Sequence, residues 1–176
     1  TAFTGEATKD RIRWNLLSVD DDHARYQHHV DVGKKFARNV RRDLQRTIGT
    51  PDNYVFFGYD TGCYEVLEWF EGTDGLAIVD QIDPGRVEKE IVLDEIDRWP
   101  GWATQVPVLH PPHYERIEAE WDLASVVMVN SEWSKEALVR QGVPKEKIEI
   151  IPIAYEPDTS MPEFSPKEEE RPFRVL

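Results

Sequence analysis

The fold is decided by residues 54–84, which read YVFFGYDTGCYEVLEWFEGTDGLAIVDQIDP. Within this stretch, residues 54–59 and 76–79 are continuous apolar runs, which are typical of strands buried in a parallel sheet. Residues 61–72 lie between them, carry apolar side chains at helical spacing and end at a glycine. A strand, a helix and a second strand in this order predict two parallel strands joined by a crossover helix.

The same alternation extends to both sides of that stretch. Residues 22–48 place apolar side chains at three- and four-residue steps, the pattern of a long amphipathic helix. Asp83 followed by Pro84 predicts the start of a helix at 84–98, because a capping carboxylate and a proline favour a helix N-terminus. The remaining predicted elements are a helix that ends near residue 124, a strand at 125–129, a helix at 131–141 and a strand at 148–153. We therefore predict an α/β fold, a Rossmann-like parallel sheet with helices on both faces.

A change of composition divides the chain near its end. Residues 156–171 are rich in proline, serine and charge, which is typical of a linker, and residues 172–176 begin another apolar run. We expect one domain at 1–155, a linker at 156–171 and the start of a second domain at 172–176. Because the first residue is Thr1 rather than methionine, we also expect the chain to start inside a longer gene product.

The composition limits the classes of partner. A net charge of −13 argues against general nucleic-acid binding, which needs clustered lysine and arginine, and against docking on anionic lipid. Cys63 is the one cysteine, so the chain has no internal disulfide and no Cys/His array for zinc. No apolar run approaches the roughly 20 residues of a transmembrane helix. We expect a cytoplasmic protein with no bound metal and no cofactor.

Candidate binding residues follow the predicted strands. In an open parallel sheet, ligands bind beyond the carboxyl ends of the strands, where helix N-termini point their free N–H groups. The residues at these exits are Tyr59, Asp60, Asp80, Gln81, Asp83, Asn130 and Ser131. The glycine patterns of dinucleotide-binding loops and P-loops are missing from the sequence, so nucleotide binding by these residues is not indicated.

Several of these residues have a simpler structural interpretation. Asp60, Asp83 and Ser131 lie at predicted helix starts, where capping alone would explain them. Asp80 ends a strand before the turn, so a cap does not explain it and it is the better candidate for a site residue.

The histidines leave two interpretations open. His28 and His29 are adjacent in a predicted helix, so they face different directions and do not have the spacing of metal ligands. His110 and His113 flank two prolines at the start of a predicted helix. They are either acid–base groups in a pocket or exposed loop residues.

Four of the six tryptophans form two pairs with different predicted positions. Trp121 and Trp133 occupy predicted core positions of helices, whereas Trp99 and Trp102 lie in a loop. The loop pair is the candidate for stacking on the apolar face of a sugar ring.

Three segments in a fixed order carry a family resemblance. They are EAEWDLASVVMVNSEWSKEAL at 118–138, GVPKEKI at 142–148 and IIPIA at 150–154. Together they closely resemble family 4 glycosyltransferases, which carry an acidic helix ending in "LAD", a strand into "V-x-S-x-x" and a helix ending "GVP-x-x-KI-x-V-I-P". The resemblance covers about a third of the chain.

The resemblance implies a GT-B enzyme that transfers a sugar, of the hexosyltransferase type, with retention of configuration and without a metal. Two Rossmann-like lobes would face a cleft, the first binding the sugar or glycan acceptor and the second binding the nucleotide-sugar. Residues 172–176 would open the second, donor-binding lobe. The family's first strand would precede Thr1 and its paired donor-binding glutamates would follow Leu176, so this piece alone should be inactive.

The resemblance also suggests roles for individual residues. Many family members place a histidine where this chain has Asp80 or Gln81, so these two are the candidate catalytic residues. Tyr59, Asp60, Asp83, Asn130 and Ser131 would line the acceptor side.

Two other functions stay open. The first is a non-catalytic Rossmann-like module that binds a glycan or a protein. The second and weaker one is a sugar-nucleotide epimerase of the same GT-B shape.

Overall fold

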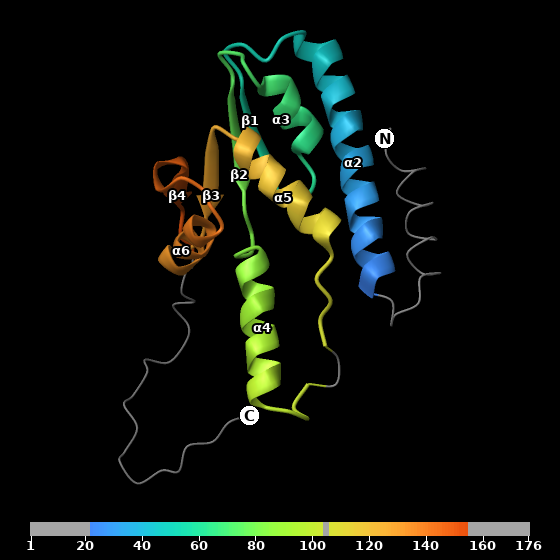
Figure 1. Cartoon of the computed structure of the whole chain (residues 1–176). Helices are drawn as coiled ribbons and strands as arrows, with labels where there is room; N and C mark the ends of the chain where they lie inside the picture. Colours follow the sequence, from blue (N-terminus) through green and yellow to red (C-terminus); the bar gives the residue numbers. More distant parts are fainter. Residues whose placement is uncertain (1–21, 104–105, 155–176) are drawn as a thin grey trace, which may run out of the picture.

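A computed structural model of the chain describes residues 22–103 and 106–154 (Figure 1). Its elements in chain order are α2 (Asp22–Ile48), β1 (Val55–Tyr59), α3 (Tyr64–Phe70), β2 (Leu76–Asp80), α4 (Arg86–Arg98), α5 (Pro111–Leu123), β3 (Val126–Val129), α6 (Glu132–Arg140), the 3-10 turn η1 (Lys145–Lys147) and β4 (Ile148–Ile150). The predicted linker and the start of a second domain lie outside the described residues.

The strands form one parallel sheet in the order β1-β2-β3-β4. Tyr59 pairs with Asp80, and Asp80 pairs with Met128, so the exits of the first three strands lie at one edge. The predicted α/β, Rossmann-like class is confirmed. The strand predicted at 148–153 is shorter than expected, because its pairing ends at Ile150.

The core lies on one face of this sheet. Ala77, Val79 and Val127 point to that face and pack with buried residues of α2, α3, α5 and α6. The exposed side chains on the other face, with their exposed fractions, are Val55 (68%), Phe57 (48%), Tyr59 (60%) and Leu76 (43%). Right-handed crossovers between strands added in one direction bring their helices to the same face. The described helices therefore form one of the two helical layers that the sequence predicts.

Two helices begin later than predicted. The first turn of α3 starts at Tyr64 rather than residue 61, because Thr61 has a left-handed backbone with φ of 63°. The helix α4 starts at Arg86 rather than Pro84, because Gly85 has φ of 65° and ends the turn before the helix. In both cases a left-handed residue separates the strand exit from the helix.

The long helix α2 lies beside α3 and α5 (Figure 1). Val30, Gly33 and Ala37 are its buried positions, together with His28. Phe36 is one of the apolar residues at helical spacing in 22–48 and is therefore predicted to face the core, but this is wrong because it is 52% exposed. Gly33 allows α2 to lie close to the loop after β1, because a Cβ at this position would lie 2.2 Å from the carbonyl oxygen of Thr61.

The tryptophan predictions are largely confirmed. Trp121 is buried in the core, and Trp99 and Trp102 are exposed. Trp133 is half exposed, so its predicted core position is wrong: it lies on the solvent side of α6, while Ser134, Ala137 and Leu138 face inward. None of the helices in the described ranges has the length and apolar character to cross a membrane.

Candidate functional site

Three of the predicted site residues meet in one hydrogen-bonded cluster where β1 and β2 end. The side-chain amide of Gln81 donates to Asp60 Oδ2 at 2.8 Å and to Asp83 Oδ1 at 3.3 Å. Asp83 Oδ1 also accepts from the backbone N–H of Gly85 at 2.7 Å. Two carboxylates from different strand exits are thus held against the same amide group.

The orientation of the Gln81 amide is fixed by Trp121. The indole N–H, which can only donate, lies 2.7 Å from Gln81 Oε1. The amide N–H groups must therefore point toward Asp60 and Asp83. Because Gln81 is 1% exposed, its side chain positions the two carboxylates and is itself shielded from solvent.

Asp60 has a pKa close to neutral pH. Burial raises the pKa of this carboxyl to about 7, and the neighbouring charges of Asp83, Glu120 and Asp80 act in the same direction. The hydrogen bond from Gln81 opposes the shift by favouring the ionised form. A carboxyl with this pKa can exchange a proton with a bound hydroxyl group at physiological pH.

The loop that follows Asp60 is held by two buried side chains of α5. Glu120 accepts from the backbone N–H groups of Thr61 (2.6 Å), Cys63 (3.1 Å) and Tyr64 (2.9 Å). Arg116 Nε donates to the Thr61 carbonyl oxygen at 2.8 Å. Thr61 keeps its left-handed backbone because both sides of its peptide group are held, and such strain is characteristic of functional loops.

The interpretation of Asp60 as a helix cap is wrong, because no aspartate side chain among the described residues caps the start of α3. The Asp60 carboxylate accepts from Gln81, whereas Glu120 satisfies the backbone N–H groups at the start of α3. A second buried pair supports Glu120: Arg116 donates to Glu65 Oε2 at 2.7 Å. Burial raises the pKa of Glu120, while Arg116 and the backbone donors lower it.

Sequence reasoning missed Glu120 and Arg116 as organisers of the site. The available signal was their position four residues apart, beside the apolar stripe of Ile117 and Trp121. Charged residues that lie next to an apolar core stripe are candidates for a buried ion pair. In the structure, Arg116 Nε lies 3.7 Å from Glu120 Oε1.

Tyr59 and Asp80 lie apart from the cluster. They are paired neighbours in β1 and β2, and their side chains point to the open face of the sheet. Burial raises the pKa of Asp80. Tyr59 presents an exposed ring on the same face. The predicted catalytic pair is therefore divided, with Asp80 on the open face and Gln81 on the helix-covered face.

Asn130 and Ser131 form the cap of α6. Ser131 Oγ accepts from the backbone N–H of Ser134 at 3.2 Å, as the capping interpretation predicts. The Ser134 hydroxyl donates to Asn130 Oδ1 at 3.2 Å. These side chains are engaged in local hydrogen bonds at the exit of β3.

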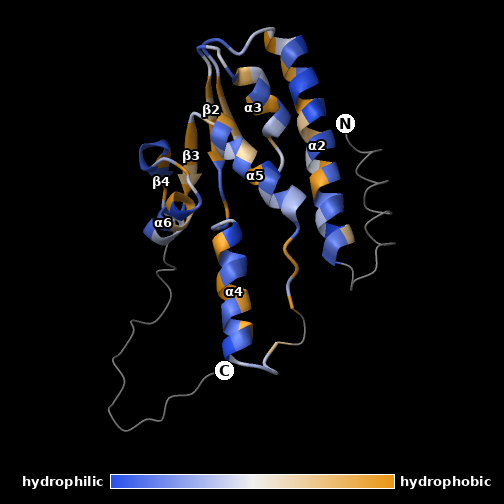
Figure 2. Ribbon diagram, in the orientation of Figure 1, coloured by the Kyte–Doolittle hydropathy of each residue, from blue (hydrophilic) through white to orange (hydrophobic). Residues whose placement is uncertain are grey.

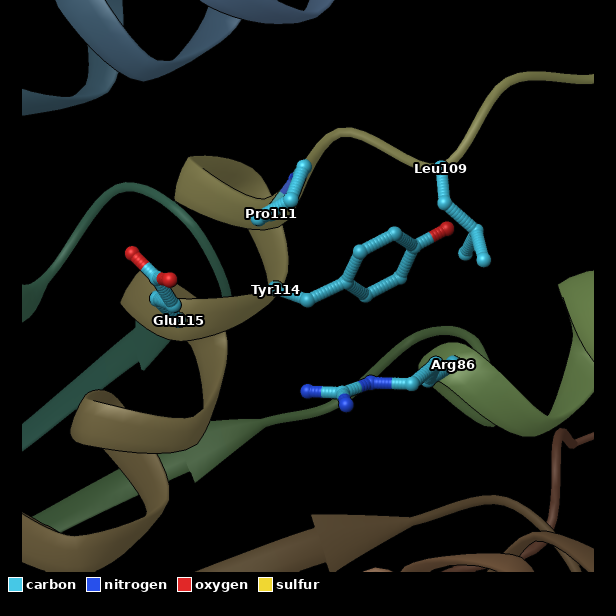
Figure 3. A pocket seen from close by; sticks show the side chains of 5 residues that line it. All are labelled: Arg86, Leu109, Pro111, Tyr114 and Glu115. Carbon is cyan, nitrogen blue, oxygen red and sulfur yellow. The ribbon is translucent and has the colours of Figure 1, made fainter.

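A cavity of about 170 Å³ lies between the starts of α4 and α5 and is lined by Arg86, Leu109, Pro111, Tyr114 and Glu115 (Figure 3). Figure 3 shows the ring of Tyr114 between Leu109 and Arg86. The Arg86 guanidinium lies 5.9 Å from the Tyr114 ring centroid and pairs with Glu118. Burial raises the pKa of the Tyr114 hydroxyl, and the charge of Asp83 contributes to the shift.

Histidines of α2 and of the N-terminal end of α5 lie close together. His110 is buried: its Nδ1 lies 3.3 Å from His23 Nδ1, and its Nε2 lies 3.3 Å from Gln27 Oε1. The exposed-loop interpretation is therefore wrong for His110. Burial lowers the pKa of His113, which the Asp83 charge partly opposes. Across residues 22–103 and 106–154, no cluster of three or more His, Cys, Asp or Glu side chains is arranged to hold a metal ion.

Comparisons of this chain with protein-family models, with curated proteins and with solved structures found no match.

Proposed function

We propose that the parent protein transfers a sugar from a nucleotide-sugar to a hydroxyl-bearing acceptor, and that this chain forms the acceptor-binding side. The observation that carries the proposal is the meeting of Asp60 and Asp83 on one fixed amide at the exits of two parallel strands. Ligands of open parallel sheets bind at such exits. The resemblance of residues 118–154 to family 4 glycosyltransferases supports the same function.

In this proposal the carboxylates of Asp60 and Asp83 accept hydrogen bonds from acceptor hydroxyl groups. Asp60 exchanges a proton near neutral pH, since its pKa is about 7. Gln81 acts through these two residues as a positioning residue. The exposed ring of Tyr59 lies on the open face of the sheet beside Asp80, apart from these carboxylates, and is not part of the proposed acceptor site.

Retention of configuration would depend on groups that stabilise the leaving nucleotide. These groups would belong to the second lobe, and their contribution is electrostatic. The acceptor side would then supply orientation, because correct placement of a hydroxyl group lowers the barrier without covalent chemistry.

The test is transfer from a panel of nucleotide-sugars by the full-length protein. We expect Asp60→Asn and Asp83→Asn to lower kcat/KM by on the order of 10²- to 10⁴-fold. Glu136→Gln is the matched control, because it changes an exposed carboxylate of α6 to an amide. Unchanged transfer by Asp60→Asn, or transfer by residues 1–176 alone, would contradict the proposal.

A non-catalytic module that binds a protein is the second candidate. The observation that favours it is the exposed apolar face of α4, which a purely catalytic acceptor domain does not require. The two candidates are separated by the same assay, since a module would give no transfer in the full-length protein.

A further inference from the structure

The first turns of α2 contact the chain just before α5 through polar and aromatic side chains. The start of α2 is mainly hydrophilic (Figure 2). His110, which precedes α5 and is 8% exposed, lies against two polar side chains of this helix. Its Nδ1 lies 3.3 Å from His23 Nδ1, and its Nε2 lies 3.3 Å from Gln27 Oε1. The ring of Tyr26 stacks on the same imidazole at a centroid distance of 6.1 Å.

The hydrogen-bond partners assign the ring hydrogens of this histidine pair. The Gln27 amide nitrogen donates to Asp31 Oδ1 at 3.0 Å, so Gln27 Oε1 is the atom that faces His110. An amide oxygen only accepts, so His110 Nε2 carries a hydrogen, and Nδ1 of the neutral ring accepts. His23 Nδ1 must then donate to His110 Nδ1. A single hydrogen atom therefore lies between the two rings.

This assignment makes the contact depend on the number of protons that the two rings carry. His23 is exposed, and a proton added at its Nε2 leaves the Nδ1–H donor in place. The hydrogen bond is then charge-assisted and stronger. A second added proton must go to His110 Nδ1, where it turns the acceptor into another donor. Two N–H groups and two positive charges then face each other, so the contact is lost.

The other titratable and charged groups around the pair come from four parts of the fold. They are Asp22 paired with Arg25, His29 and Asp31 on α2, Asp83 in the turn before α4, Lys89 on α4 and His113 on α5. Burial lowers the pKa of both His29 and His113, which therefore gain protons at a lower pH than an unperturbed histidine. The first proton taken up in this region thus goes to the pair.

We propose that His23 and His110 form a pH switch between the starts of α2 and α5. The switch is closed while the pair carries no more than one added proton, and it opens when both rings are charged. His110 is flanked by Leu109 and Pro111, which both line the cavity between α4 and α5. Opening of the switch therefore releases one wall of that cavity. Histidine is the side chain that ordinarily changes its charge between pH 5 and 8.

The first test determines the ring hydrogens in the ¹⁵N-labelled chain of residues 1–176 by long-range ¹H–¹⁵N correlation NMR. At pH 8 we expect His110 in the Nε2–H form and His23 in the Nδ1–H form. Either ring in the opposite form would overturn the proposal, because the hydrogen bond between the rings would then have a different donor.

The second test follows hydrogen-exchange protection of the amides of residues 26–30 from pH 8 to pH 5, corrected for the intrinsic effect of pH. We expect protection to rise as the first proton is taken up. It should then fall by about tenfold as the second ring becomes charged, because one hydrogen bond is lost. The amides of β2 should keep their protection over the same range. A monotonic profile, or an equal fall in β2, would overturn the proposal.

Variants of the exposed partner separate the switch from a purely structural contact. His23→Asn keeps a polar group near the position of Nδ1 but cannot become charged, so the fall in protection at low pH should disappear. His23→Ala removes the hydrogen bond and should lower protection about tenfold at pH 8. His29→Asn, at an exposed histidine of the same helix, is the control and should retain the fall. An unchanged fall in His23→Asn, or its loss in His29→Asn, would overturn the proposal.

Discussion

The loop after β1 and the helix after β2 leave the same edge of the sheet and are held in opposite ways. The loop is fixed along its whole length, with Thr61 bonded on both sides and Glu120 collecting three backbone N–H groups. Among residues 22–103 and 106–154, the helix α4 is held mainly near its base, through Gln141 and Arg86. A surface that orients small polar groups must be held rigidly, as the loop after β1 is. A surface that binds a large partner can be held at one end, as α4 is.

The largest expected effect is the removal of the Glu120 carboxylate. Glu120→Ala leaves three backbone N–H groups without their acceptor and removes one of the two carboxylates paired with the buried Arg116. We expect a loss of about 3–5 kcal/mol of unfolding free energy, the range for breaking a buried ion pair. Urea unfolding measures it, with Glu136→Ala as the exposed control. A loss under about 1 kcal/mol would mean that the loop is not held by Glu120.

Asp60 should make stability depend on pH. A carboxyl whose pKa is higher in the folded protein than in the unfolded chain stabilises the fold at low pH. That contribution is lost as the pH rises from about 4 to the folded pKa of about 7. Asp60→Asn should remove this decline and stabilise the protein at pH 8 by up to about 4 kcal/mol, from 1.36 kcal/mol per pKa unit.

Urea unfolding at a series of pH values checks this expectation. Asp52→Asn is a control for loss of one negative charge, although Asp52 also accepts from the backbone N–H of Asp74. A decline between pH 4 and 7 that persists unchanged in Asp60→Asn would contradict the assignment.

The contact between α2 and the loop can be tested at Gly33. A Cβ at this position would lie 2.2 Å from the Thr61 carbonyl oxygen, so the helix or the loop must move. We expect Gly33→Ala to cost about 1–3 kcal/mol of unfolding free energy, as overpacking does. Gly62→Ala is the matched control in the loop itself, because its Cβ would have no neighbour closer than 3.7 Å. Equal stabilities of the two variants would contradict the close contact.

The base of α4 should respond more weakly than the loop. Gln141→Ala removes hydrogen bonds to the residues on both sides of Gly85, at a cost of about 1–2 kcal/mol. Hydrogen exchange of the α4 amides should become faster than in the unaltered chain, because local opening of the helix becomes easier. Gln45→Ala, at an exposed position of α2, should leave exchange in α4 unchanged.

The smallest effect on stability is expected in the loop that follows α4. Trp102→Ala removes a side chain that is 86% exposed and should change the unfolding free energy by less than about 0.5 kcal/mol. A stability loss as large as that of Gln141→Ala would mean that Trp102 supports the fold of α4. In that case α4 and the loop after it would not be a surface exposed for binding a partner.

The sheet could be predicted from the sequence because its signals are local. The apolar runs at 54–59 and 76–79 and the glycines between elements specify strand and helix directly. The starts of α3 and α4 could not be placed, because they depend on left-handed backbones at Thr61 and Gly85. Thr61 adopts that conformation only through contacts with Glu120 and Arg116, far away in the sequence.

The candidate site was predictable in its location but not in its organisation. The strand-exit rule selects Asp60, Gln81 and Asp83 correctly as neighbours. Asp80 and Gln81 point to opposite faces of the sheet because side chains alternate along β2. The helix starts and the motif spacing used for the prediction carry no information about this alternation. The role of Glu120 depends on tertiary packing of α5 against the loop, for which the sequence offers only a weak signal.

One measurement tests the central claim most directly: a ¹³C NMR titration of the aspartate side-chain carboxyl carbons in residues 1–176. The account predicts one carboxyl that titrates near pH 7 and disappears from the spectrum of Asp60→Asn. It also predicts that this midpoint moves when Gln81→Leu removes the shared amide. An Asp60 carboxyl that titrates near pH 4 would contradict the buried carboxylate cluster on which the proposed acceptor site depends.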